Sequence, residues 1–267
     1  MDADPIRDHL LHLRRDRYSH ATIAERARIL RTLPDPIGMD REATQAWWET
    51  RQTRADGSPR AASSLSGEAS HVREFWRWCR RNDLLNHNPA DWLPKVRQSK
   101  TMAVSVSEAD LYVIIQDADP HMRRMIALAA MAGLRSSEVA GVRWEDVDRA
   151  NGVLWVRGGK GGKDRSVPLS AGLLAELGTP ASGPIIGRQM TAKAVSMAIG
   201  RHMRAHDVDL TAHKLRARYA TRFIAATGDA VAAAKVLGHS DLSSILRYAV
   251  ASGDTMRRGA EAAGRIG

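Results

Sequence analysis

Cysteine, aromatic residues and long apolar runs are all scarce in this chain of 267 residues. The single cysteine, Cys79, excludes an internal disulfide and a zinc site built from several cysteines, and it favours a reducing cytoplasm. We expect Cys79 to pack in a core beside Trp76 and Trp78. No run of 18 uncharged apolar residues occurs, and the N-terminal residues lack a basic segment followed by an apolar one. Neither a membrane span nor export is therefore expected.

Positive charge is what the chain has in excess. It carries 40 Lys and Arg against 30 Asp and Glu, which gives a formal net charge of +10. Each phosphate that a basic side chain neutralises releases condensed counterions, so this excess favours a nucleic-acid partner. The alternative is a basic protein with no such role, in which codon bias explains why 33 of the 40 basic residues are arginine.

Apolar residues with helical spacing organise the first hundred residues. Two buried stripes are predicted, and Pro and Gly clusters interrupt the pattern where helices should end. This predicts a bundle of about four helices over residues 1–95. Pro89 and Pro94 forbid a continuous helix, so a basic linker is expected over residues 96–106. The stripes consist of Ile23, Ala27, Leu30 and Leu33, and of Leu65, Ala69, Val72, Trp76 and Cys79.

Helices and one β-hairpin are expected in a second domain over residues 107–267. A first helix should begin after Ser107, and a second helix should span about residues 121–132. Residues 153–156 and 166–169 then flank a Gly-rich basic stretch, which is typical of an antiparallel hairpin. Later segments return to helical spacing. The predicted boundaries are Ser107 as an N-cap, Thr191, Thr211 and Ser240 ahead of later helices, and Gly133, Gly228 and Gly238 at helix ends.

Five short segments in the second domain combine basic side chains with one tyrosine at set spacings. His213 and Arg216 are three residues apart, which puts both on one face of a helix. His239 follows Arg216 by 23 residues, and Tyr248 follows His239 by nine. In order, the segments are Ala132–Glu138, which contains Arg135, the turn around Lys160, His213–Arg216, Leu237–Ser240 and Tyr248.

This set resembles the signature of the tyrosine recombinases, the phage integrase family, over most of residues 125–250. The resemblance implies a helical, SAM-like core-binding domain and a mainly helical catalytic domain with a small antiparallel β-sheet. It also implies a site-specific DNA recombinase in the cytoplasm of a bacterial host. Such an enzyme acts as a homotetramer on two double-stranded DNA sites and is a monomer when free. The chain resembles two-domain members that lack an arm-binding module, and an accessory directionality factor is left open.

The resemblance implies that Tyr248 attacks the scissile phosphate and forms a 3′-phosphotyrosyl link. The five-coordinate state carries extra negative charge on its non-bridging oxygens, which Arg135 and Arg216 would clamp. No metal or other cofactor is required, because the covalent link stores the bond energy.

Proton transfer is expected from a lysine and two histidines. Lys160 would protonate the departing 5′ oxygen, with Lys163 as the competing candidate. His213 would accept a proton or hydrogen bond from the tyrosine, and His239 would donate to a phosphate oxygen. Which histidine moves protons stays open.

Other interpretations of the same residues are weaker. Glu138 is expected to orient nearby backbone or an arginine rather than to react. Arg157 and Asp164 break the spacing of a nucleotide-binding loop, so no ATP site is implied. A type IB topoisomerase would use the same cleavage step, and a DNA-binding regulator could keep the fold without cutting. A metal-dependent nuclease would need clustered carboxylates or histidines. Residues 249–267 could be a tail exchanged between subunits.

Overall fold

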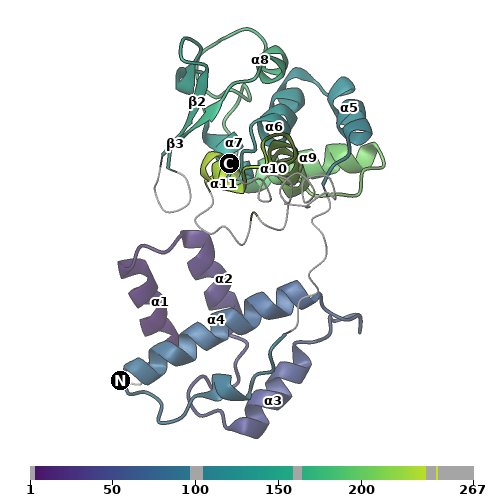
Figure 1. Cartoon of the computed structure of the whole chain (residues 1–267). Coiled ribbons are helices and arrows are strands. Elements are labelled where there is room, and N and C mark those ends of the chain that lie inside the picture. Colours follow the sequence, from purple (N-terminus) through teal and green to yellow (C-terminus); the bar gives the residue numbers. More distant parts are fainter. Residues whose placement is uncertain (1–3, 97–104, 159–163, 239–244, 246–267) are drawn as a thin grey trace, which may run out of the picture. The chain divides into compact units, whose positions relative to one another are not determined.

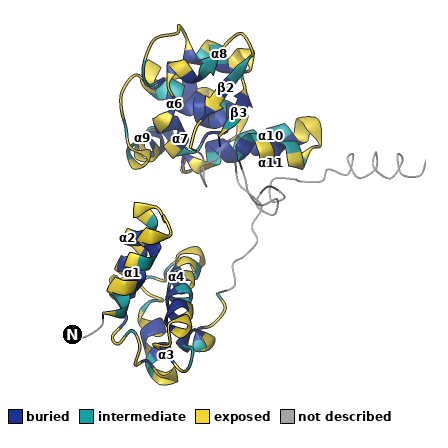
Figure 2. Cartoon of the chain, turned by 90° about the vertical axis from the view of Figure 1, so that its left-hand side faces the viewer, coloured by how far each residue is buried: buried dark blue, intermediate teal, exposed yellow. Residues whose placement is uncertain are grey.

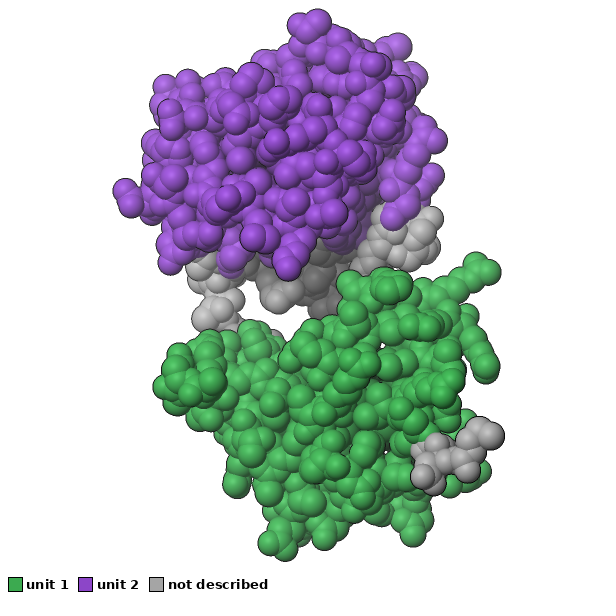
Figure 3. Space-filling view, turned by 180° about the vertical axis from the view of Figure 1, so that it is seen from behind, with its two compact units in different colours: residues 1–100 green, residues 101–267 purple. Residues whose placement is uncertain are grey.

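The computed structural model describes residues 4–96, 105–158, 164–238 and Ile245 (Figure 1). The chain forms two compact units, residues 1–100 and 101–267 (Figure 3). The predicted linker over residues 96–106 spans this division. Because residues 97–104 lie outside the described part, the linker remains a prediction.

The first unit contains four α-helices and a short 3-10 helix, which agrees with the predicted bundle. Asp4 and Ser19 cap the first two helices through their side chains, and Asp40 caps the third. The helices are α1 (Pro5–Arg15), α2 (His20–Leu30), α3 (Arg41–Thr50), α4 (Ala62–Arg81) and the 3-10 helix η1 (Pro89–Trp92).

Tryptophan and phenylalanine fill the core of this unit. Trp76 and Phe75 on α4 are fully buried, and the inner faces of the helices are buried throughout (Figure 2). The Trp76 indole donates to the carbonyl of Pro36 at 2.9 Å, so its buried N–H is satisfied. Cys79 is buried as predicted, and burial raises the pKa of its thiol to about 12. Of the two predicted stripes, only Leu65 is partly exposed.

The second unit is mainly helical with one small sheet, as predicted. Its strands form a three-stranded antiparallel sheet in the order β1-β2-β3, so the hairpin gains a short strand that the sequence did not predict. Val153 pairs with Pro168 and Val156 with Arg165. The elements are α5 (Glu108–Gln116), α6 (Pro120–Met131), α7 (Ser136–Gly141), η2 (Trp144–Asp146), β1 (Val147–Asp148), β2 (Val153–Val156), β3 (Arg165–Pro168), α8 (Ala171–Leu177), α9 (Ala192–Ala205), α10 (His213–Thr227) and α11 (Ala230–Leu237).

Helix α6 lies at the centre of this unit and packs against α8, α9 and α10. Residues 125–130 of α6 are all buried, which follows from their unbroken apolar sequence. This packing fixes the end of α6, and the loop after it, against the start of α10.

Most predicted boundaries agree with the structure. The hydroxyls of Ser107 and Thr191 accept from the backbone N–H groups of Asp110 and Ala194, and Gly228 ends α10 in the left-handed conformation. Thr211 lies just ahead of α10, as predicted, while Ala212 occupies the N-cap position and no side chain caps the helix. Ser240 lies outside the described residues. In the part of the chain that is described, no helix has the length and apolar character to cross a membrane.

One carboxylate in the first unit is buried with its charge. Glu68 on α4 accepts hydrogen bonds from Arg51 and Arg60, and its side chain is 1% exposed. Burial alone would raise the pKa of Glu68, but the bonds from Arg60 and Arg51 outweigh it and lower the pKa. Glu68 is therefore ionised at neutral pH and joins α4 to the segment that follows α3.

We expect Glu68→Gln to lower the free energy of unfolding by about 3 kcal/mol, because the neutral amide leaves two arginines without their buried partner. Glu74→Gln is the matched control, since Glu74 pairs with Arg77 on the exposed face of the same helix. This control should cost less than about 1 kcal/mol. Urea unfolding of the full chain, followed by tryptophan fluorescence, measures both, and equal losses would contradict a special role for Glu68.

Candidate active site

Arg135 lies at the N-cap position of α7, held from both its backbone and its side chain. Its backbone N–H donates to Glu138 Oε2 at 2.8 Å, and its Nη1 donates to Glu138 Oε1 at 2.9 Å. The guanidinium also donates from Nη2 to the carbonyl of Gly238 at 3.0 Å, and from Nη1 to that of Leu237 at 3.4 Å. The sequence spacing Arg-x-x-Glu thus places both partners in the first turn of one helix.

Gly133, just before Arg135, is required by the backbone and by its neighbours. Its φ is +66°, and a Cβ at this position would lie 2.6 Å from Leu237 Cδ2 and 2.7 Å from Tyr219 Cδ1. In this conformation the Gly133 carbonyl accepts from Arg216 Nη1 at 2.6 Å. The loop between α6 and α7 therefore helps to place an arginine that belongs to α10.

Arg216 on α10 is 3% exposed, yet it contacts the same groups as Arg135. Its Nη2 donates to the Leu237 carbonyl at 2.6 Å, and its Nη1 lies 3.5 Å from Glu138 Oε2. Two arginines that are distant in sequence therefore share a carboxylate and a carbonyl oxygen. The structure brings these two predicted phosphate ligands together.

Glu138 holds a third arginine as well, and its carboxylate is almost fully buried. Arg165 at the start of β3 donates from Nη1 to Oε1 at 2.8 Å and from Nη2 to Oε2 at 2.9 Å. Burial alone would raise the pKa of Glu138, but hydrogen bonds from Arg165 and the Arg135 backbone, with the charges of Arg165 and Arg216, lower it to about 2. The carboxylate stays ionised, and the cluster keeps a surplus of positive charge that suits a phosphate.

The C-terminal end of α11 supplies the remaining acceptors. The last carbonyls of a helix lack intrahelical partners and carry partial negative charge, so they attract cations. Gly238 ends this helix with φ of +63° and immediately precedes His239. Three carbonyls at this end of α11, those of Val236, Leu237 and Gly238, accept hydrogen bonds from arginines. We call them, together with the Glu138 carboxylate, the acceptor cluster. Its carbonyls belong to Val236, which accepts from Arg165, Leu237, which accepts from Arg135 and Arg216, and Gly238, which accepts from Arg135.

The other predicted site residues are only partly covered by the structure. His213 is the first residue of α10, one turn before Arg216, and it is exposed. Lys160, His239 and Tyr248 lie outside the described residues, as do the competing Lys163 and the tail over residues 249–267. The roles of these residues therefore remain predictions.

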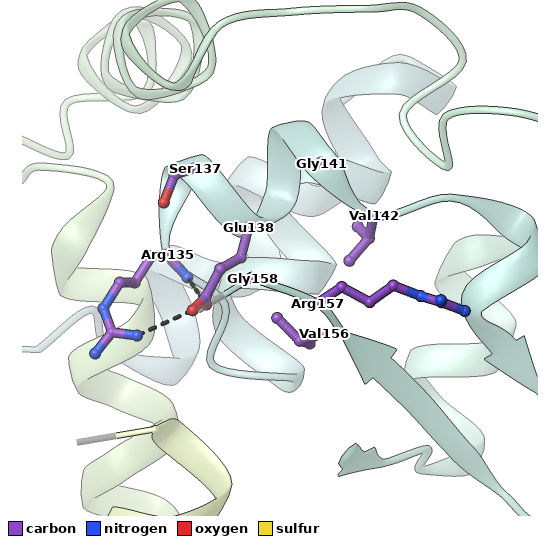
Figure 4. Close-up of a pocket in the computed structure, with 8 residues that line it drawn as sticks. All are labelled: Arg135, Ser137, Glu138, Gly141, Val142, Val156, Arg157 and Gly158. Atoms are coloured by element: carbon purple, nitrogen blue, oxygen red, sulfur yellow. Dashed lines mark hydrogen bonds and ion pairs between the residues drawn. The ribbon is translucent and has the colours of Figure 1, made fainter. Parts of the chain in front are cut away.

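A hollow of about 390 Å³ lies beside the Arg135–Glu138 pair (Figure 4). Residues of α7 line it together with Val156 and Gly158, where the chain leaves β2 toward Lys160. The Arg135 guanidinium turns toward Glu138, whereas Arg157 extends away and donates to Asp146 at 2.8 Å. Across residues 4–96, 105–158 and 164–238, no group of three or more His, Cys, Asp or Glu side chains could hold a metal ion.

Sequence patterns did not predict the part that Arg165 plays. The residue stood among other basic residues of the hairpin turn, and neither spacing nor residue type separated it from them. Its partners are distant in the chain, so only folding reveals them. The expectation that Glu138 orients an arginine is confirmed by its contacts, although three arginines are involved instead of one.

The fold is similar to that of solved integrases. A lambda integrase dimer bound to a COC′ core site matches with a TM-score of 0.73 at 18% identity, covering 93% of this chain and 95% of that chain. The Tn1549 transposon integrase in complex with circular intermediate DNA matches with a TM-score of 0.72 at 19% identity, covering 96% and 97%. At such identities the likeness shows the fold.

Sequence comparison establishes the family. The model of the phage integrase family matches residues 105–253. Tyrosine recombinase XerC of Yersinia pestis is 31% identical over 207 residues, covering 70% of this chain and 68% of the relative. Tyrosine recombinase XerD of Ralstonia nicotianae is 29% identical over 220 residues, covering 73% and 71%. The chain belongs to the phage integrase family, and with it to the tyrosine recombinases.

The charge of Glu138 should contribute to stability in a defined pH range. Its pKa is lowered in the folded chain from 4.5 to about 2, so the contribution is present above about pH 4.5 and is lost as the pH falls toward 2. We expect Glu138→Gln to destabilise the chain by about 3 kcal/mol at pH 7. The difference from wild type should shrink by about 1 kcal/mol at pH 3.5, because there the wild-type carboxylate is mostly protonated in the unfolded chain but still ionised in the folded one. Urea unfolding at both pH values measures it, and a constant difference would refute the assignment.

Gly133→Ala should disturb the site more than its backbone conformation alone explains. Gly152 is the matched control, since its φ is +64° and nothing lies within 4 Å of an added Cβ. Gly152→Ala should cost about 1 kcal/mol, from the positive φ alone. Gly133→Ala should cost about 2–4 kcal/mol, because overlap with Leu237 and Tyr219 adds to that strain. If the two variants lose similar free energies of unfolding in thermal or urea experiments, then Leu237 and Tyr219 move aside at no cost, and the prediction is wrong.

Proposed function

We propose that the chain is a site-specific recombinase that cuts and rejoins double-stranded DNA through a 3′-phosphotyrosyl intermediate. The observation that carries the proposal is the convergence of Arg135 and Arg216 on the acceptor cluster, which includes the carbonyl of Gly238, the residue before His239 in the sequence. The family and the matches to tyrosine recombinases support the same activity.

The arginines stabilise the charge that develops on the phosphate. In-line attack by the Tyr248 oxygen forms a bond to phosphorus and places extra negative charge on the non-bridging oxygens. Arg135 and Arg216 donate to these oxygens, and their preorganised positions lower the cost of the step. His239, directly after the acceptor cluster, donates to the same phosphate.

Tyr248 and the departing oxygen each need a proton transfer. A phenol with an ordinary pKa near 10 is a weak nucleophile at neutral pH, so its proton passes to His213 as the new bond forms. The bond from phosphorus to the 5′ oxygen breaks, and Lys160 gives its ammonium proton to that oxygen. Attack by the 5′-hydroxyl of another strand reverses these steps and frees Tyr248, so no cofactor is consumed.

DNA binding uses both parts of the chain in this proposal. Residues 1–95 form the core-binding domain and residues 107–267 the catalytic domain, joined by the linker over residues 96–106. Four copies assemble on two recombination sites, and the free protein is a monomer, in a bacterial cytoplasm. The excess of basic residues supplies contacts to phosphates, whereas base recognition comes from helix faces in the major groove.

The test compares wild type with Tyr248→Phe on DNA that traps the intermediate. A duplex bound by the protein is selected from a random library and nicked near the cleavage position, so that the released fragment diffuses away. Wild type should give a denaturation-resistant protein–DNA band in EDTA, and Tyr248→Phe should give none while it binds the duplex as tightly. The missing phenol oxygen is the reason, and gel electrophoresis is the measurement.

Other outcomes would replace the proposal. Tight binding without a covalent band from either protein would favour a DNA-binding regulator. Relaxation of supercoiled plasmids by the monomer, without a specific site, would favour a type IB topoisomerase. Cleavage that EDTA abolishes would favour a metal-dependent nuclease.

A further inference from the structure

Arg165 connects the β2–β3 hairpin to the acceptor cluster. Beyond its two bonds to Glu138, its Nε donates to the Val236 carbonyl at 2.7 Å. In the described part of the chain, the hydrogen bonds from this hairpin to α7 and α11 all come from Arg165. Its side chain is 10% exposed, so these partners surround it.

The guanidinium of Arg165 is occupied by the protein itself. Its Nε, Nη1 and Nη2 each donate to a member of the acceptor cluster. Its side chain also passes closely over Gly238, where an added Cβ would lie 3.1 Å from Arg165 Cδ and 3.2 Å from its Nη1. Arg165 therefore contacts the residue just before His239 and acts through its neighbours.

Arg165 lies close in sequence to Lys160, the predicted general acid. It follows Lys160 by five residues and forms one end of the segment that carries this lysine. The other contacts at the base of that segment are local to the sheet and η2, from Arg157 to Asp146 and from the Gly158 N–H to Asp164 Oδ1 at 2.8 Å. Arg165 alone among these contacts reaches the elements that hold Arg135 and Arg216.

We propose that Arg165 is a positioning residue that holds the start of β3, five residues after Lys160, against Glu138 and the end of α11, so that protonation of the leaving group depends on it. The inference rests on the proposed function. In the step concerned, the bond from phosphorus to the 5′ oxygen breaks while the Lys160 ammonium gives that oxygen a proton and becomes an amine. Arg135 and Arg216 keep their carbonyl acceptors when Arg165 is replaced, so phosphate binding depends on it much less.

The experiment separates leaving-group protonation from every other contribution. Two trapping substrates of the same sequence are compared, one with an ordinary phosphodiester and one with sulfur in place of the 5′ bridging oxygen. A thiolate leaves without a proton, because a thiol has a pKa of about 8.5. Single-turnover rates of covalent product formation are measured for wild type, Arg165→Gln, Arg165→Lys and Lys160→Ala.

Arg165→Gln should slow cleavage of the ordinary substrate about 10- to 100-fold, part of the 10²–10⁴ that general acid catalysis contributes. With the sulfur substrate its rate should return to within about threefold of wild type, and Lys160→Ala should behave the same way. Arg165→Lys, which keeps the charge but loses the paired geometry, should fall between wild type and Arg165→Gln. Adding Arg165→Gln to Lys160→Ala should cause no further loss on the ordinary substrate.

Two results would overturn the inference. One is an equal loss on both substrates, which would place the effect in the phosphate contacts or in the fold, and the other is no loss on either. Should Arg165→Gln fail to fold by thermal unfolding, Arg165→Lys serves the same comparison, because it leaves Glu138 with three cationic neighbours. Failure of the proposed function is distinguishable, since wild type would then form no covalent product with either substrate.

Discussion

The Glu138 carboxylate is the group around which the second unit arranges its arginines. Three guanidinium groups from α7, β3 and α10 would repel one another at this distance, and Arg216 is almost fully buried. A single buried anion, together with the carbonyls at the end of α11, makes their proximity favourable. The three arginines and one carboxylate leave a net positive charge, which a bound phosphate would neutralise. Preorganisation of this kind precedes any contact with DNA.

The same arrangement links elements that the chain order keeps apart. The acceptor cluster joins the loop after α6, the base of the hairpin and the last turn of α11, so a displacement of one element alters the hydrogen bonds of the others. Two glycines allow this close packing because they have no side chain. A side chain at Gly133 would overlap Leu237 and Tyr219, and one at Gly238 would crowd Arg165. Site geometry and fold stability therefore depend on the same few contacts.

Local patterns predicted the helices and the hairpin, since helical spacing and strand composition are properties of short segments. The resemblance to the tyrosine recombinases also placed Arg135 and Arg216 at one site, and the structure brings both onto Glu138 and the Leu237 carbonyl. The short strand β1 was missed, because two residues carry too little periodicity to detect. Arg165 was missed for a different reason: its partners Glu138 and Val236 are far away in sequence, and a basic turn gives no sign of which arginine faces inward.

The state of the native thiol has a practical consequence. Cys79 is fully buried in the core of the first unit, and its pKa of about 12 leaves almost no thiolate at neutral pH. The chain contains no other cysteine. A cysteine introduced on an exposed helix face would therefore be the one thiol that reacts quickly with a maleimide. A single fluorophore or spin label can therefore be attached to an introduced cysteine without first replacing Cys79.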